Sequence, residues 1–322
     1  MTSKTLPASQ IGVLSLPDSV KLQSFPVPQP GPGEVLIQNV AVASNPKDWK
    51  YPSWDPEYAN IEGSDAAGII VAVGEGVTEF KGGERVAAFN KMGTKNNKHG
   101  CYAQYTVTPA STTFPIPDSV SFEEASTIPL AAMTAAIALF INLGFPEQPT
   151  EPQQGIIING AATSVGAYAI QLAKRAGLYV IGVAGSSKDY AKELGADVVV
   201  DYRAHKGDDL EGALVKAAEG RRVSRVLDTI SENGSIVLLS RVLAKTSPDG
   251  KGKVEYILFL SKEEEKLIPQ GITTHQTWVS SAYGDDEAFA ARFYRQISKW
   301  LEVTPKVQNH SSQTAYESYL TD

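Results

Sequence analysis

The segment GIIINGAATSVGAYAIQLAKRAGLYVIGVAGSSK, residues 155–188, decides the fold of this chain. Residues 156–158 are a short isoleucine run, which predicts a strand buried on both faces, as strands of parallel sheets are. From about Val165 the apolar spacing becomes helical, and Gly177 ends this helix before a second apolar run at 178–184. The pattern predicts a βαβ unit whose first turn meets a dinucleotide pyrophosphate at a helix N-terminus.

The turn after the first strand departs from the usual glycine pattern of dinucleotide sites. Gly160 and Gly166 can serve as its outer glycines, but Thr163 and Ser164 occupy the middle. By itself the turn therefore fits a packed strand–turn–helix without a ligand equally well. We predict that Gly160, Thr163, Ser164 and Val165 bind the cofactor.

The end of the second strand indicates which cofactor is bound. A site for NAD places Asp or Glu there to bind the ribose 2′-hydroxyl, but residues 184–188 are AGSSK and carry no acid. The Ser186 hydroxyl and the Lys188 ammonium suit a 2′-phosphate, which needs donors and positive charge. Alternatively, Ser187 caps the next helix and Lys188 is solvated, and both readings can hold together.

Composition excludes several classes of protein. With 322 residues and 42% hydrophobic content, the chain can bury one large core or two medium cores. A formal net charge of -7 argues against nucleic-acid binding. The single cysteine, Cys101, excludes an internal disulfide framework and a zinc site of several cysteines. We find no apolar signal core and no membrane-length run, so we expect a cytoplasmic protein with no membrane partner.

Residues 1–120 predict a barrel-like β domain, because short strands alternate there with Pro and Gly turns. Residues 45–50 are expected in a loop, since Pro46 discourages helix before it, and residues 91–99 form a polar loop. Strands are expected at residues 11–14, 35–42, 66–73, 85–89 and 102–107.

Residues 121–301 predict a doubly wound parallel sheet, because strands and helices alternate. Ser121 and Glu124 form a capping box before an alanine-rich helical segment that is interrupted at Pro129. Residues 302–322 form a polar tail without a strand pattern. Besides the opening unit, helices are expected at 189–194, 208–219, 236–244 and 285–301, and strands at 198–201, 223–227 and 254–260.

Several phrases, taken in order, resemble the medium-chain dehydrogenase/reductase superfamily: PGPGEV at 30–35, GSDAAG at 63–68, FKGGERV at 80–86 and GAD at 195–197. The resemblance implies an α/β protein with a GroES-like catalytic domain, 1–120, a Rossmann cofactor domain, 121–301, and an atypical tail, 302–322. Within the superfamily the chain is similar to the zinc-free quinone-oxidoreductase branch, nearest to the trans-acting enoyl reductases of fungal polyketide biosynthesis. The phrases that carry this likeness are NPKDWK at 45–50, AMTA at 132–135 and DYR at 201–203.

The resemblance also implies that no metal is bound. Zinc-using relatives carry a cysteine where this chain has Asn45, and a His-Glu pair where it has Ser64 and Asp65. Their structural zinc needs four cysteines near residues 91–101, where Cys101 is alone. Cys101 is expected to be a small buried residue. His99 is expected to be a polar loop residue, and the other histidines to be solvated: His205, His275 and His310.

Without a Lewis acid, conjugate reduction is easier than alcohol oxidation, because donors alone can stabilise the enolate. The resemblance implies Lys50 near the reacting carbonyl, Thr134 on the nicotinamide carboxamide and Tyr202 at the adenosine phosphate, with Asn45 also binding the cofactor. Alternatively, Lys50 is solvated, Thr134 is an ordinary helix residue and Tyr202 packs at a strand end.

The sequence therefore predicts an NADPH-dependent, zinc-independent reductase of activated C=C bonds, with a small-molecule or carrier-tethered enoyl substrate and a polyketide synthase as partner. Reduction of free quinones or small enones is a second possibility. A third is a cofactor-binding protein with a non-redox role. It stays open because relatives continue with a helix and a closing strand where residues 305–322 have no strand pattern. The front domain is therefore expected to lack its last strand, which affects activity more than cofactor binding.

Overall fold

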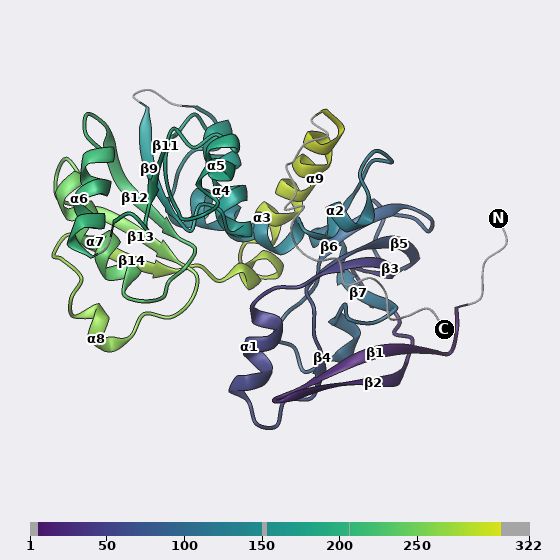
Figure 1. Cartoon of the computed structure of the whole chain (residues 1–322). Coiled ribbons are helices and arrows are strands. Elements are labelled where there is room, and N and C mark those ends of the chain that lie inside the picture. Colours follow the sequence, from purple (N-terminus) through teal and green to yellow (C-terminus); the bar gives the residue numbers. More distant parts are fainter. Residues whose placement is uncertain (1–5, 150–152, 206, 304–322) are drawn as a thin grey trace. The chain divides into compact units, whose positions relative to one another are not determined.

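A computed structural model describes residues 6–149, 153–205 and 207–303 (Figure 1). The chain divides into two compact units. Unit 1 contains the residues up to Leu130 and those from Ser280, and unit 2 is Ala131–Val279. These units differ from the predicted ranges 1–120 and 121–301, because the last long helix, α9 (Glu287–Val303), contacts strand β8 (Thr113–Pro115) of unit 1. Of the predicted tail, 304–322 lies outside the described residues.

Unit 2 is built on a six-stranded parallel sheet with the order β11-β10-β9-β12-β13-β14. Counted along the chain, this order is 3-2-1-4-5-6, as in the Rossmann fold, which confirms the predicted doubly wound sheet. The order reverses between β9 and β12, and ligands of such sheets bind beyond the strand ends at that point. The strands are β9 (Gln154–Asn159), β10 (Tyr179–Ala184), β11 (Val198–Asp201), β12 (Arg222–Asp228), β13 (Gly252–Tyr256) and β14 (Ile272–Gln276).

Helices connect the first five strands in the positions that the sequence predicts, but the last part of the sheet differs in three ways. Helix α8 (Lys262–Glu265) was not expected. The predicted strand 254–260 ends at Tyr256, and β14 was not expected. Only Ile272 is buried in β14, so the strand has no apolar run to mark it. The helices are α3 (Pro129–Ala136), the π-helix Ile137–Asn142, α4 (Ser164–Arg175), α5 (Lys188–Glu193), α6 (Asp208–Ala217), α7 (Ser235–Thr246) and α8 (Lys262–Glu265).

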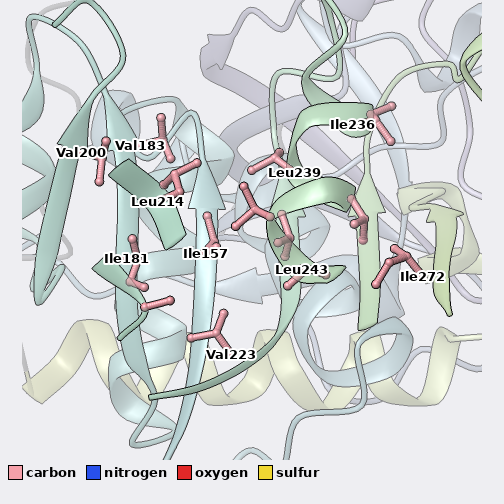
Figure 2. Packing of buried hydrophobic residues seen from close by; sticks show 14 residues of the cluster. Ile157, Ile181, Val183, Val200, Leu214, Val223, Ile236, Leu239, Leu243 and Ile272 are labelled. Atoms are coloured by element: carbon pink, nitrogen blue, oxygen red, sulfur yellow. The ribbon is translucent and has the colours of Figure 1, made fainter. Parts of the chain in front are cut away.

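The core of unit 2 explains why strands β9 and β10 carry continuous apolar runs. Ile157, Ile181 and Val226 on the sheet share one buried cluster with Leu214 of α6 and Leu243 of α7 (Figure 2). Because helices cover the faces of the parallel sheet, few strand positions face water.

Unit 1 contains two small antiparallel sheets, with the orders β7-β3-β5-β6-β8 and β2-β1-β4. They are the β-rich front domain that the short strands predict. The strands are β1 (Ser9–Leu16), β2 (Ser19–Pro26), β3 (Glu34–Ala43), β4 (Asn60–Ile61), β5 (Asp65–Val73), β6 (Arg85–Phe89), β7 (Tyr105–Pro109) and β8 (Thr113–Pro115). The helices are α1 (Lys47–Trp54), α2 (Phe122–Ser126) and α9 (Glu287–Val303), with 3-10 turns at Asn97–His99, Ala110–Thr112 and Val279–Tyr283.

Strands β2, β4 and β8 and helix α1 of unit 1 were not predicted. Strand β2 is exposed along most of its length, so it lacks the alternation that marks a half-buried strand. Helix α1 replaces the loop expected at 45–50. Pro46 lies at its N-cap, with φ -53, where a missing N–H costs no intrahelical hydrogen bond.

Helix α9 is anchored on unit 1 by polar contacts. The Ser298 hydroxyl donates to the Pro115 carbonyl at 2.9 Å, and the Tyr294 hydroxyl donates to the Pro129 carbonyl at 2.9 Å. These contacts place α9 in unit 1, although its residues fall within the predicted range 121–301.

The helical segment Phe122–Asn142 begins with the predicted capping box, in which its N-cap Ser121 and Glu124 bond reciprocally. By length and composition this 21-residue helical segment could span a membrane, but 72% of its most apolar window is buried within the protein. Such burial is typical of a core helix.

We predict that Leu214→Ala lowers the free energy of unfolding by about 2–5 kcal/mol, because it removes a fully buried side chain from the core of unit 2. Leu267→Ala, at a position 62% exposed, is the matched control and should change the free energy by about 0.5 kcal/mol or less. Urea unfolding of both variants measures the difference, and equal values would contradict the assigned core.

Candidate cofactor and substrate site

The turn between β9 and α4 is shaped by two glycines. Gly160 has φ +70, in the left-handed region. A Cβ on Gly166 would lie 2.2 Å from the Gly160 carbonyl oxygen, so only glycine allows the first turn of α4 to approach the strand end this closely. Thr163 is the N-cap of α4, and its Oγ1 accepts from the Gly166 N–H at 3.0 Å. Ser164 and Val165 follow in the first turn, where backbone N–H groups have no acceptor inside the helix.

The tips after β10 and β11 bring cationic side chains together. The Lys188 ammonium lies 3.5 Å from Asp201 Oδ2. The Arg203 guanidinium binds the same carboxylate with both arms, Nε to Oδ1 at 3.2 Å and Nη2 to Oδ2 at 3.1 Å. Hydrogen bonds from Arg203 hold the pKa of Asp201 below its usual range. Asp201 therefore joins two positive charges at this end of the sheet.

Tyr202 lies against the backbone of the preceding tip. A Cβ on Gly185 would lie 2.8 Å from the Tyr202 ring, so the ring can pack there only because residue 185 has no side chain. The ring remains 51% exposed. Lys188 and Tyr202 thus lie together in the segments that follow β10 and β11, and Ser186 is exposed next to Gly185. Arg203 was missed as a site residue, although the phrase DYR contains it.

Thr134, the other predicted site residue of unit 2 outside these loops, lies buried on α3. Lys50 lies on α1 of unit 1, half-buried, with its ammonium 5.5 Å from the centre of the Trp49 ring.

Lys47 lies one turn before Lys50 on α1, and its side chain is only 12% exposed. Its ammonium lies 2.8 Å from Asp48 Oδ1 and 2.6 Å from Glu62 Oε2. Burial alone would lower the pKa of Lys47, but the carboxylates of Asp48 and Glu62 outweigh it and raise that pKa. Removing either carboxylate would leave the Lys47 ammonium with one ion-pair partner in place of two, at a position largely shielded from water.

Polar contacts, with little apolar burial, hold α1 in place. Its buried residues are Asp48 and Pro52. Asp48 Oδ2 accepts from the Asn45 N–H at 2.8 Å and from the Tyr102 hydroxyl at 2.6 Å. Two aromatic residues of α1, Trp49 and Trp54, are 64% and 52% exposed. The helix is therefore held by charged residues on its inner side, Lys47 and Asp48, and exposes the aromatic rings of Trp49 and Trp54 on its outer side.

Asn45 and Asp65 are hydrogen-bonded to each other. The Asn45 amide donates to Asp65 Oδ2 at 2.8 Å, and the Leu130 N–H donates to Asp65 Oδ1 at 2.7 Å. Burial raises the pKa of Asp65 to about 7 although both hydrogen bonds oppose the shift. The Cys101 thiol donates to the Asp65 carbonyl at 3.3 Å, and burial raises the pKa of this thiol well above its usual range. The expected burial of Cys101 is thus confirmed.

The histidines are placed differently from one another. The expectation that His99 is a polar loop residue was wrong, because it is buried and its Nδ1 lies 2.9 Å from the Val107 carbonyl oxygen. His205 and His275 are exposed at their rings but lie 2.8 Å from Asp209 and 3.0 Å from Glu255. His310 lies outside the described residues. Within the described ranges, no group of three or more His, Cys, Asp and Glu side chains could hold a metal ion.

Comparison of the sequence with known proteins identifies the family of this chain. Residues 31–118 match the alcohol dehydrogenase GroES-like domain, and residues 164–299 match the zinc-binding dehydrogenase domain. The chain is 34% identical over 310 residues to trans-enoyl reductase fsr4 of Gibberella fujikuroi, covering 91% of this chain and 88% of the relative. It is 36% identical over 219 residues to quinone-oxidoreductase QR1, chloroplastic, of Triphysaria versicolor, covering 66% and 64%.

A solved structure supports the fold. The crystal structure of CurK enoyl reductase superposes with a TM-score of 0.73 and 22% identity, covering 91% of this chain and 88% of that one. The chain therefore belongs to the medium-chain dehydrogenase/reductase superfamily, and it is an oxidoreductase that uses a nicotinamide cofactor.

Proposed function

We propose that this protein uses NADPH to reduce activated C=C bonds in enones or enoyl thioesters, without zinc. The observation that carries the reaction is the match to trans-enoyl reductase fsr4 along 91% of the chain. The observation that supports NADPH is the cationic group formed by Lys188 and Arg203 at the adenosine end of the sheet. A 2′-phosphate would take these donors, whereas a ribose 2′-hydroxyl would find no acid at the end of β10.

The proposed roles of the residues follow from the charge that develops in conjugate reduction. When bound, the cofactor would supply the hydride that the β-carbon needs, and the resulting negative charge would lie on the carbonyl oxygen of the substrate. The Lys50 ammonium stabilises that oxygen, and the Thr134 hydroxyl holds the nicotinamide carboxamide so that one ring face is presented. A proton from water or a side chain completes the reduction at the α-carbon.

Zinc independence is supported by the chemistry of the donors that stand in place of the usual ligands. A side-chain amide is not among the usual zinc ligands, and the Asn45 amide already donates to Asp65. The Cys101 thiol is buried and its raised pKa opposes the thiolate form that binds metals.

We propose a carrier-tethered acyl chain, delivered by a polyketide synthase, as the natural substrate. The exposed rings of Trp49 and Trp54 beside Lys50 on α1 offer apolar contact to such a chain. The match to quinone-oxidoreductase QR1 supports free quinones or small enones as a second candidate. Comparing turnover of a carrier-bound enoyl thioester with that of the free acceptor separates the two.

Cofactor preference is the first test of this proposal. NADPH should bind more tightly than NADH, and Lys188→Ala should cost about 1–3 kcal/mol of NADPH binding, the scale of a charge-assisted hydrogen bond. Binding of NADH should change little. Lys192→Ala, on the same helix α5, is the control and should leave both affinities near those of the parent. Fluorescence titration measures the constants, and equal affinities of the parent for the two cofactors would refute the assignment.

The reaction itself is tested by Lys50→Ala in single-turnover oxidation of NADPH, with an enone or enoyl thioester and a zinc chelator present. Turnover should fall about 10²–10³-fold, as when one oxyanion donor is lost, while NADPH affinity stays near that of the parent. Thr134→Ala should lower both, because Thr134 holds the nicotinamide. The exposed Lys21 of β2, changed to Ala, is the control.

Two outcomes would decide against parts of this mechanism. Parent-like turnover of Lys50→Ala would remove Lys50 from the reaction. A parent that binds NADPH but reduces no conjugated carbonyl would favour a cofactor-binding protein with a non-redox role.

A further inference from the structure

The loop between β12 and α7, residues 229–234, has no role in the proposed mechanism. Strand β12 ends at Asp228, which is paired in register with Asn159 at the end of β9. The loop therefore begins beside the turn that is proposed to bind the pyrophosphate, at the point where the strand order reverses.

The Thr229 side chain reaches from this loop into that turn. Its hydroxyl donates to the Asn159 carbonyl oxygen at 2.7 Å and lies 2.9 Å from Thr163 Oγ1. Since the Thr229 hydrogen is used on Asn159, the hydrogen between the two hydroxyls comes from Thr163. Thr163 in turn accepts from the Gly166 N–H. A continuous relay thus connects the first turn of α4 to the end of β9 through Thr229.

Gly160 leaves the space that this relay occupies. A Cβ on Gly160 would lie 2.4 Å from Thr229 Oγ1, closer than real Cβ contacts allow. Its φ of +70 also favours glycine. The turn and the Thr229 hydroxyl are therefore fitted to each other.

The loop that carries Thr229 is itself held firmly. Asp228 is fully buried, and its Oδ1 accepts from the Asn159 amide at 2.8 Å and from the Ser231 N–H at 3.0 Å. Its Oδ2 accepts from the Ser235 hydroxyl at 2.5 Å. Ser231 and Asn233 have φ of 54 and 57, a conformation that non-glycine residues rarely adopt and that persists only where the surroundings enforce it.

We propose that Thr229 is a positioning residue for the pyrophosphate turn. By fixing the Thr163 hydroxyl, it sets the N-cap of α4 and so the direction of the first-turn N–H groups that meet the pyrophosphate. Thr229 acts through Thr163. The inference rests on the proposed function only in that a dinucleotide binds at this turn.

The test measures the Kd of NADPH, NADH and 2′-AMP for the variants Thr229→Val and Thr229→Ser and for the parent. The valine variant keeps the shape of the side chain and removes the hydroxyl, so the Kd of NADPH and that of NADH should each rise about tenfold, as for one lost hydrogen bond in a buried site. The Kd of 2′-AMP, which has no pyrophosphate, should stay unchanged. The serine variant, which keeps the hydroxyl, should restore NADPH binding to within about twofold.

A matched control and a double-mutant cycle separate positioning from general loss of stability. The Thr246 hydroxyl donates to the Val223 carbonyl at 3.2 Å near the opposite end of β12, so Thr246→Val should leave all three affinities unchanged. Thr163→Val should weaken NADPH by a factor similar to that of Thr229→Val. The double variant should lose little more NADPH affinity than either single variant, because both substitutions break the same hydrogen-bond relay.

Parent-like NADPH binding by Thr229→Val would overturn the inference, as would equal weakening of 2′-AMP or failure of the serine variant to restore binding. A parent that binds neither dinucleotide would remove the proposed function and the inference with it. A parent that binds NADPH, beside an unaffected Thr229→Val, would remove the inference alone.

Discussion

The close approach of α4 to the end of β9 is the constraint on which unit 2 depends. With no side chain on Gly166, the helix can begin directly beside the Gly160 carbonyl, and its axis then returns along the sheet toward β10. A larger residue would clash with the Gly160 carbonyl and the Ala161 backbone, and would move the start of the helix away from the central strand. The same approach leaves the helix N-terminus open to a ligand at the place where the strand order reverses.

Helices and strands are well predicted from the sequence where their side chains are buried in a regular pattern. Strands β9 and β10 are apolar on both faces because the sheet is covered, and glycines stop α4 and α5. Strands β2 and β14 have too few buried residues to leave a pattern. Helix α1 was missed because ion pairs fix it, and its spacing of apolar residues carries no helical signal.

The candidate site is less readable from sequence, since its contacts join distant parts of the chain. Residue types at the tip 184–188 suggest a phosphate, but not that Asp201 gathers Lys188 and Arg203. Nothing local distinguishes Thr229, whose hydroxyl meets Thr163 across 66 positions. His99 was assigned to a polar loop because its neighbours are polar, whereas burial follows from the fold of the segment onto β7.

The charged anchor of α1 has a consequence for how this protein can change over evolutionary time. Lys47, Asp48 and Glu62 hold the helix from its inner side, so the outer rings of Trp49 and Trp54 add little to the core. Substitutions at exposed positions of this kind usually alter stability by about 0.5 kcal/mol or less. Descendants of this sequence can therefore exchange the outer residues of α1 and acquire different surface chemistry there, while the helix itself stays in register.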